Sequence, residues 1–213
     1  MSKREETRAK IIEAAEQLFH RYGLEKTSMD DIAKGAQKAK GALYYYFESK
    51  EDLFRVVVSE ELDVIKSKLE LVVEDSNMSD FEKLKQYLIQ RMQLIKDSLN
   101  YSQIIKTDMQ SRLDNEKKVS LLDDIKSDFD KWELAQVKKI VKGCIKSFNM
   151  PQIMAIVDIT AATDMIVMII KSVEIQFVLR DKYKDYSATF NFLAEIIISN
   201  LQNLATHNPI GNK

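Results

Sequence analysis

The stretch Lys40–Phe54, KGALYYYFESKEDLF, places three adjacent tyrosines between a Gly-Ala pair and an acidic cluster. If residues 39–47 form a helix, successive side chains are turned by about 100°. Leu43 and Phe47 then share one face, which we expect to be buried. The opposite face is made of small residues and phenols, namely Gly41, Ala42, Tyr44 and Tyr45, with Tyr46 at its border.

A small-residue face beside two phenols suits the close approach of another molecule. Glycine inside a helix costs roughly 0.5–1 kcal/mol relative to alanine, so its presence favours a steric reason. Phenol hydroxyls can reach phosphates or base edges, and a small side chain can meet a thymine methyl. The segment 34–50 carries four lysines against one glutamate, although the whole chain has a net charge of −1. Such a local basic patch is sufficient for phosphate contacts. The alternative is that the tyrosines are ordinary packing residues and the lysines cover a solvated face.

Upstream of this stretch, the sequence predicts two further short helices. Apolar residues recur at helical spacing over 6–22, and Gly23 is suited to ending that helix. Thr27 or Ser28 can cap a second helix, with an aspartate three residues later as in a capping box. Ser49 can cap the helix that follows the tyrosines. Short helices joined by tight turns indicate a helix-turn-helix.

The rest of the chain predicts longer helices, at 50–75, 79–99, 101–113, 116–149, 151–181 and 186–206. Only 5 glycines and 2 prolines occur in 213 residues, which favours helices over a turn-rich β architecture. The expected fold is therefore all-α with about nine helices. We expect a helix-turn-helix domain over 1–50 and a helical ligand-binding and dimerisation domain over 51–213.

Several classes of protein are disfavoured by the composition. The single cysteine, Cys144, allows no intrachain disulfide and fits a reducing cytoplasm, and the N-terminus has no signal-peptide core. Charges interrupt the most apolar stretch, so no membrane span is expected. The two histidines, His20 and His207, do not form a Glu-x-x-His pair or a zinc cluster. We therefore expect no enzyme activity, no metal and no cofactor.

Residues 8–54 resemble the DNA-binding domain of the TetR family of bacterial transcriptional regulators, about a quarter of the chain. The segments that carry the likeness are RAKIIEAAEQLFHRYGLEKTSMDDIAKGA and KGALYYYFESKEDLF. The matching positions are Arg8, Ile11, Ala14, Ala15, Leu18, Phe19, Gly23, Thr27, Ile32, Ala33, Ala36, Lys40, Gly41, Leu43, Tyr44, Phe47, Lys50 and Leu53.

The resemblance implies two sets of DNA contacts. Phosphates would be held by Thr27, Lys40, Tyr44 and Lys50. The major groove or its rim would be met by Gln37, Lys38, Gly41, Ala42, Tyr45 and Tyr46. This chain departs from the family at the turn: Gln37 stands where glycine is frequent, Lys38 where an apolar residue is frequent, and Ala39 where a serine cap is frequent. Loss of a cap costs on the order of 1 kcal/mol.

The two last helices are apolar on more than one face, which favours an isologous four-helix dimer interface. Its candidate residues are Ile170, Val173, Phe177, Phe190, Leu193, Ile197 and Leu201. The alternative is that these helices only close the monomer core. Candidates for the lining of an effector cavity are Tyr101, Met109, Phe129, Trp132, Met165 and Met168, which could equally be core residues. Because few charges fall on inward-facing positions, the expected effector is hydrophobic.

These features predict a homodimeric, cytoplasmic repressor that binds a palindromic double-stranded DNA operator and is released by a small effector. Helix-turn-helix dimers read two half-sites about 34–36 Å apart. The alternative is an architectural or protein-recruiting DNA-binding protein on the same scaffold, without a ligand switch. A collapsed C-terminal core would favour that alternative.

Overall fold

The computed structural model describes residues 2–98, 100–103, 105–106, 121–147, 158–180 and 183–206. Within these residues the regular elements are all helices, so the predicted all-α class is confirmed. No helix among them is long and apolar enough to span a membrane. The chain packs into two units. The N-terminal unit comprises residues 1–64 with 98–125, and the C-terminal unit comprises 65–97 with 126–213.

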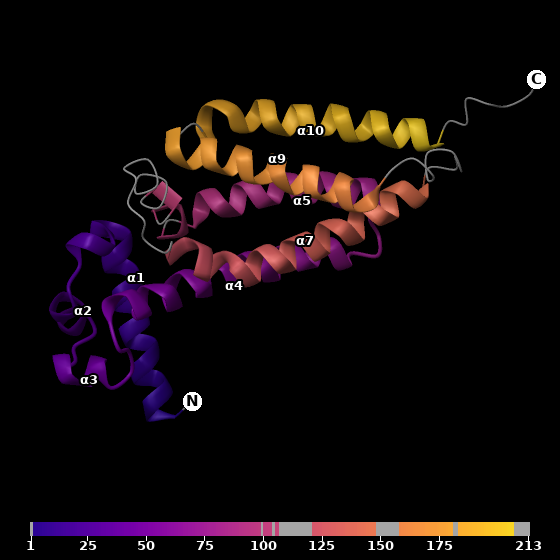
Figure 1. Ribbon diagram of the computed structural model, residues 1–213. Helices are drawn as coiled ribbons and strands as arrows, with labels where there is room; N and C mark the ends of the chain where they lie inside the picture. Colours follow the sequence, from indigo (N-terminus) through magenta and orange to yellow (C-terminus); the bar gives the residue numbers. More distant parts are fainter. Residues whose placement is uncertain are drawn as a thin grey trace, which may run out of the picture. The chain divides into compact units, whose positions relative to one another are not determined.

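In the N-terminal unit, α1 (Lys3–Lys26), α2 (Met29–Gly35), α3 (Lys40–Tyr44) and the first part of α4 (Lys50–Glu74) surround a small apolar core (Figure 1). Phe19 of α1 meets Phe54 of α4 edge to face, with ring centroids 4.9 Å apart. Other fully buried side chains of this core are Ile11, Ala15, Ile32, Leu43, Leu53 and Val58. α3 buries only Leu43, so most of this five-residue helix remains outside the core.

Local signals in the sequence fix the helix ends of this unit. Gly23 interrupts α1 with a φ of 80°, a conformation that glycine adopts without steric cost. The Ser28 hydroxyl accepts from the Asp31 amide, and the Asp31 carboxylate accepts from the Ser28 amide, which completes the predicted capping box of α2. The Ser49 hydroxyl accepts from the Asp52 amide at 3.0 Å and caps α4 as predicted.

The C-terminal unit is built from the rest of α4 with α5 (Asp80–Asp97), α7 (Leu121–Ser147), α9 (Ile159–Arg180) and α10 (Tyr183–Thr206). α5 packs against both α9 and α10. The observed ends agree with the predicted ones to within a few residues for α4, α5 and α10. The predicted helix over 151–181 is seen from Ile159, and residues 151–157 lie outside the described part, as do most of 101–113.

A buried charge cluster joins three helices of the C-terminal unit. Arg91 of α5 donates from Nε to Oε1 of Glu133 on α7 at 2.6 Å, and from an Nη atom to Oε2 of Glu174 on α9 at 2.8 Å. The three side chains are at most 1% exposed. The Tyr87 hydroxyl also donates to Glu133 at 3.3 Å, and burial raises the pKa of Tyr87 far above its ordinary value. The expectation that few charges point inward is therefore wrong for this unit.

Replacing Arg91 with methionine should destabilise the protein by about 3–5 kcal/mol, because the buried Glu133 would lose its cation and the buried Glu174 would keep only Lys126. The control is Lys131→Met, since Lys131 lies on the exposed surface of α7 and pairs with Asp128 at 3.5 Å; it should change stability by less than about 0.5 kcal/mol. Urea unfolding followed by circular dichroism measures both. Equal stability of the two variants would contradict this role for Arg91.

Candidate nucleic-acid interface

The turn between α2 and α3 depends on an unusual backbone conformation at Gln37. Its φ is 54°, in the left-handed region that favours glycine. The Lys38 amide donates to the Ala33 carbonyl at 2.9 Å, and the Gln37 amide donates to the Lys34 carbonyl at 3.1 Å. These two bonds form a Schellman motif, which normally has glycine at this position. The turn therefore has the Schellman geometry although glutamine, which disfavours a positive φ, stands at this position.

The start of α3 lacks a side-chain cap, as the alanine at position 39 predicts. Ala39 has an extended backbone and makes no capping hydrogen bond from its side chain. The helix is shorter than the predicted 39–47, because regular α-helix ends at Tyr44 and a turn follows. The amides of Tyr46 and Phe47 both donate to the Leu43 carbonyl at 2.9 Å, so the chain continues to wind.

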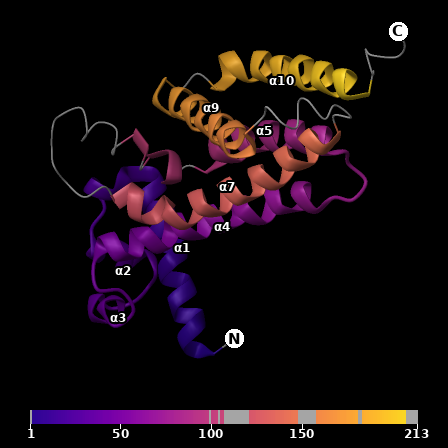
Figure 2. The ribbon, with the colours of Figure 1, turned by 45° about the vertical axis from the view of Figure 1, so that its right-hand side comes forward.

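The faces of α3 agree with the helical projection except at Ala42, which was expected on the exposed face. Leu43 and Phe47 are buried, and Tyr46 and Ala42 are half-buried. Gly41, Tyr44 and Tyr45 are exposed, and Tyr45, at 66%, is more open than Tyr44, at 49% (Figure 2 views α3 almost along its axis). A Cβ atom added at Gly41 would meet no atom within 4 Å. Packing inside the protein therefore does not require glycine at this position. Without a side chain at Gly41, another molecule can approach the backbone of α3 closely.

The residues predicted to hold phosphates lie in different environments. Lys40 is exposed and pairs with Asp30 at 2.9 Å, and this hydrogen bond raises the pKa of Lys40. Tyr44 is half exposed, and Lys50 is half-buried at the first position of α4. Thr27 is only 3% exposed, and its hydroxyl donates to the Gly23 carbonyl at 2.7 Å. The Thr27 side chain is therefore buried between α1 and α2, where its hydroxyl stabilises the connection between the two helices.

Two arginines of α1, which the sequence patterns did not identify as contacts, lie against the end of α3. The Arg4 guanidinium is 5.3 Å from the centre of the Tyr45 ring, and the Arg8 guanidinium is 5.4 Å from the centre of the Phe47 ring. Tyr45 in turn meets Tyr46 edge to face at 5.1 Å. The four-residue spacing of Arg4 and Arg8 puts them on one face of α1. This spacing in the sequence could have indicated that both arginines lie on the same side as α3.

The residues predicted to line an effector cavity lie in different surroundings. Met165 and Met168 are 63% and 65% exposed, so they line no interior cavity. Tyr101 is buried in the N-terminal unit, whereas Phe129 is buried in the C-terminal unit. Phe129 lies beside the half-buried Trp132 and under Arg91, whose guanidinium is 5.0 Å from the ring centre. Met109 lies outside the described residues.

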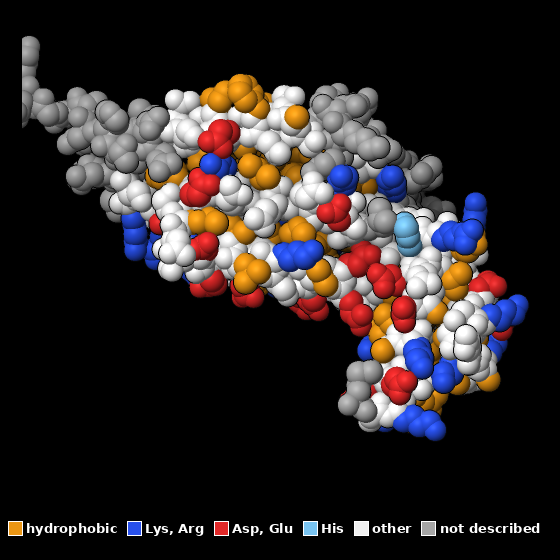
Figure 3. Space-filling view, turned by 180° about the vertical axis from the view of Figure 1, so that it is seen from behind, with side chains coloured by type: hydrophobic (Ala, Val, Ile, Leu, Met, Phe, Trp, Pro, Cys, Tyr) orange, Lys and Arg blue, Asp and Glu red, His pale blue; other side chains and the backbone are white. Residues whose placement is uncertain are grey.

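The predicted dimer residues divide into two groups. Ile170 and Phe177 are buried in the monomer, because they face inward from α9, and Val173 and Phe190 are half-buried. Leu193 and Ile197 are exposed, and the side chain of Leu201 lies outside the described part. The exposed apolar residues of α9 and α10 are Met165, Met168, Ile169, Phe192, Leu193, Ile196 and Ile197, which we call the α9–α10 face. Figure 3 shows apolar side chains at the top of the view, where α10 lies.

Residues 11–57 match the model of the family described as bacterial regulatory proteins, tetR family. The N-terminal domain is a TetR-family domain. It is 43% identical over 54 residues to the HTH-type transcriptional regulator TtgR of Pseudomonas putida, which covers 25% of this chain and 26% of the relative. The chain is 32% identical over 89 residues to a probable acrEF/envCD operon repressor of Escherichia coli, and this alignment covers 42% of the chain and 40% of the relative.

The solved structures extend the likeness to the whole fold. The transcriptional regulator FadR from Bacillus subtilis, determined in complex with stearoyl-CoA, aligns with a TM-score of 0.67 and 24% identity. The alignment covers 90% of this chain and 97% of that one. The helices of this chain are therefore arranged as in that structure. The sequence likeness to curated relatives spans about a quarter to two fifths of their length.

Gln37→Gly should stabilise the N-terminal unit by about 0.5–1 kcal/mol. Relief of a left-handed conformation is worth about 1–2 kcal/mol, and the greater freedom of glycine in the unfolded chain offsets about 0.4–1 kcal/mol of it. The matched control is Gln37→Ala, which removes the same side-chain atoms beyond Cβ and keeps the conformational cost. Thermal and urea unfolding measure both variants. If glycine and alanine behave alike, the strain at this turn is negligible.

Proposed function

We propose that this protein is a DNA-binding transcriptional regulator, most simply a homodimeric repressor that a small-molecule effector releases from its operator. The observation that carries the proposal is the α3 surface: an open backbone at Gly41 beside two exposed phenols, presented by a TetR-family domain. Gln37, Lys38, Gly41, Ala42, Tyr45 and Tyr46 would meet the groove or its rim. Lys40, Tyr44 and Lys50 would meet phosphates, with Thr27 supporting the joint behind them.

The effector would be held by the C-terminal unit. Two of the curated relatives are named as an HTH-type transcriptional regulator and a probable operon repressor, and the FadR structure contains stearoyl-CoA. An effector of this chain need not be purely apolar, because Arg91, Glu133 and Glu174 are buried in the same unit. Binding would favour one of two conformations through different affinities for them. The half-buried Trp132 beside Phe129 offers a fluorescence signal for such a ligand.

A second copy of the chain is the proposed occupant of the α9–α10 face. Seven large apolar side chains are exposed there at helical spacing, on two helices of one unit. Large apolar side chains gathered in the open on two helices favour an interaction surface, because monomeric proteins rarely leave large apolar patches in contact with water. A helix-turn-helix reads only a few base pairs, and a two-fold dimer supplies the second recognition helix.

The experiment that tests DNA recognition is selection of bound duplexes from a random pool, followed by affinity measurements across a salt series. We expect an inverted repeat and an affinity that falls steeply with salt. Tyr44→Ala should weaken binding by about 10- to 150-fold per protomer, since a hydrogen bond to a charged group is worth about 1.5–3 kcal/mol. Lys50→Ala should reduce the slope of log affinity against log salt by about 1 per protomer, because it removes one cation from the phosphate backbone.

Tyr22→Ala is the matched control, because Tyr22 is as exposed as Tyr44 but lies on α1. It should bind like the wild type. Salt-dependent binding without an enriched sequence would favour an architectural protein on this scaffold. Unchanged affinity of both the Tyr44 and Lys50 variants would refute their assignment to DNA contacts.

Phe192→Glu should convert the dimer to a monomer, because a two-fold contact would bring buried carboxylates close to one another. The control is Leu71→Glu, since Leu71 is 74% exposed and lies on α4, outside the α9–α10 face. Sedimentation analysis should give about twice 24.7 kDa for the wild type and for the control. A Phe192→Glu protein that keeps the dimer mass would exclude this face as the interface.

A further inference from the structure

Arg4 occupies a defined position at the beginning of α1. The Ser2 hydroxyl accepts from the Glu5 amide at 3.2 Å, and the Glu5 carboxylate accepts from the Ser2 amide at 2.7 Å. This capping box begins the helix at Lys3, so Arg4 lies in an ordered first turn. From there its guanidinium extends over the ring of Tyr45 at 5.3 Å from the ring centre.

The contact with the Tyr45 ring does not use the N–H groups of the Arg4 guanidinium as hydrogen-bond donors. Arginine can cover an aromatic face with its plane while its N–H groups, which lie in that plane, donate to another group. Arg4 and Tyr45 are both exposed. The pair therefore presents directed donors beside the most open side chain of the recognition helix.

The neighbouring acids are engaged elsewhere. Glu5 belongs to the capping box, and Glu6 pairs with Lys10 at 3.1 Å. Within the described part of the chain, Arg4 forms no ion pair with a carboxylate. Arg8, one turn later, differs because it approaches Glu60 at 3.9 Å.

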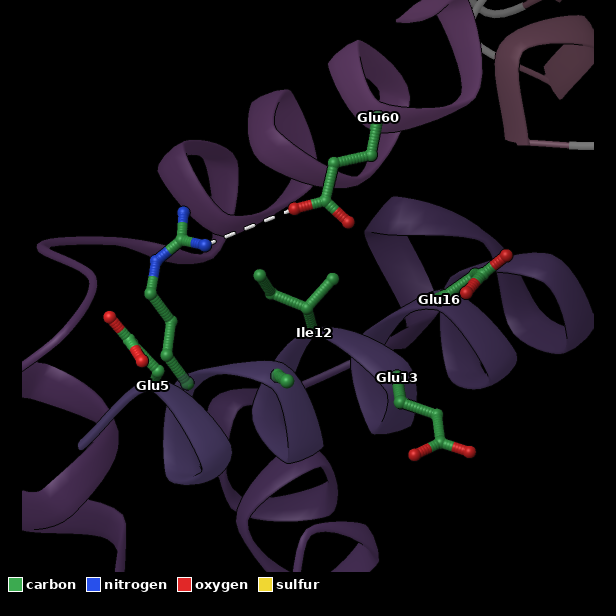
Figure 4. Close-up of a pocket in the computed structure, with 7 residues that line it drawn as sticks. Glu5, Ile12, Glu13, Glu16 and Glu60 are labelled. Atoms are coloured by element: carbon green, nitrogen blue, oxygen red, sulfur yellow. Dashed lines mark ion pairs between the residues drawn. The ribbon is translucent and has the colours of Figure 1, made fainter. Parts of the chain in front are cut away.

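The side of α1 that borders α4 is acidic. Arg8 is one lining residue of a groove of about 250 Å³ that Glu5, Glu13, Glu16 and Glu60 also line (Figure 4). In the close-up, Glu13 and Glu16 project from α1 and Glu60 from α4, and the dashed line marks the pair of Glu60 with Arg8. Four carboxylates around one arginine repel a phosphate. Arg4, over the ring of Tyr45, offers an approaching DNA backbone a cation that pairs with no carboxylate of the described chain.

We propose that Arg4 binds a DNA phosphate outside the stretch read by α3, using the Tyr45 ring as its platform. The inference rests on the proposed DNA-binding function and adds a contact from α1 to it. A guanidinium edge can donate two parallel N–H bonds to one phosphate. Such a contact carries no base information itself, but it fixes how Tyr45 and the rest of α3 enter the groove.

The test compares the full-length wild type with Arg4→Ala, Arg4→Lys and Arg21→Ala on the duplex selected by the wild type. Arg21 is the matched control, because its guanidinium is 5.2 Å from the centre of the Tyr22 ring, an equivalent pair at the other end of α1. We expect Arg4→Ala to reduce the slope of log affinity against log salt by about 1 per protomer. Arg4→Lys should retain most of that slope, and Arg21→Ala should match the wild type.

Phosphate-ethylation interference on the same duplex locates the contact. The wild type should be blocked by ethylation at a phosphate flanking the half-site, and Arg4→Ala should be insensitive there. An unchanged salt slope and interference pattern in Arg4→Ala, together with a reduced slope in Lys50→Ala, would overturn this contact and leave the DNA-binding proposal standing. Absence of salt-dependent binding by the wild type would overturn both.

Discussion

The backbone turn at Gln37 is the constraint on which the candidate interface depends. α3 has five residues, and a helix of that length has no stability of its own in water. Its direction is set at one end by the Schellman motif and along its length by burial of Leu43 and Phe47. Once these are in place, the exposure of Gly41, Tyr44 and Tyr45 follows from helix geometry. Gln37 therefore has an unfavourable left-handed conformation at the turn that sets the direction of α3.

The C-terminal unit is organised by a different kind of constraint. Arg91 holds Glu133 and Glu174 in a buried cluster, and Lys126 approaches Glu174 at 3.3 Å, so two cations face two carboxylates. A buried ion pair of this kind adds little net stability over an apolar core, but any shift of α7 or α9 along α5 would leave a buried charge unpaired. α10 is attached to α5 differently, through apolar packing and the more exposed pair Lys85–Glu195 at 3.0 Å. The register of α5, α7 and α9 is therefore more narrowly defined than that of α10.

Features governed by neighbours in the sequence were predictable. The Ser28–Asp31 capping box, the Ser49 cap and the buried stripe of α3 all follow from local spacing and were confirmed. Gly23 was expected to end the first helix, whereas it interrupts α1, which continues to Lys26. Periodicity also identified α9 and α10 as apolar on several faces, but it does not say what covers each face. Met165 and Met168 were therefore assigned to a cavity and Ile170 and Phe177 to an interface, while the structure places the first two outside and the others inside. The Arg91 cluster was missed because each of its residues looks like an ordinary polar position on its own helix.

The helical projection of α3 predicts how exposed the three adjacent tyrosines are, but it does not predict which residues of other helices contact them. Tyr46 is half-buried against Tyr45 and Phe47, as its place beside the buried stripe predicts. Tyr44 is open, which the same projection predicts. Tyr45 is also open, but its ring has a neighbour from α1, and no projection of α3 could supply Arg4. An amphipathic ring suits all three positions, because tyrosine can pack one part of its surface and keep its hydroxyl in water. A run of phenylalanine would have left exposed rings without a polar tip, and a run of serine would have given Arg4 no platform.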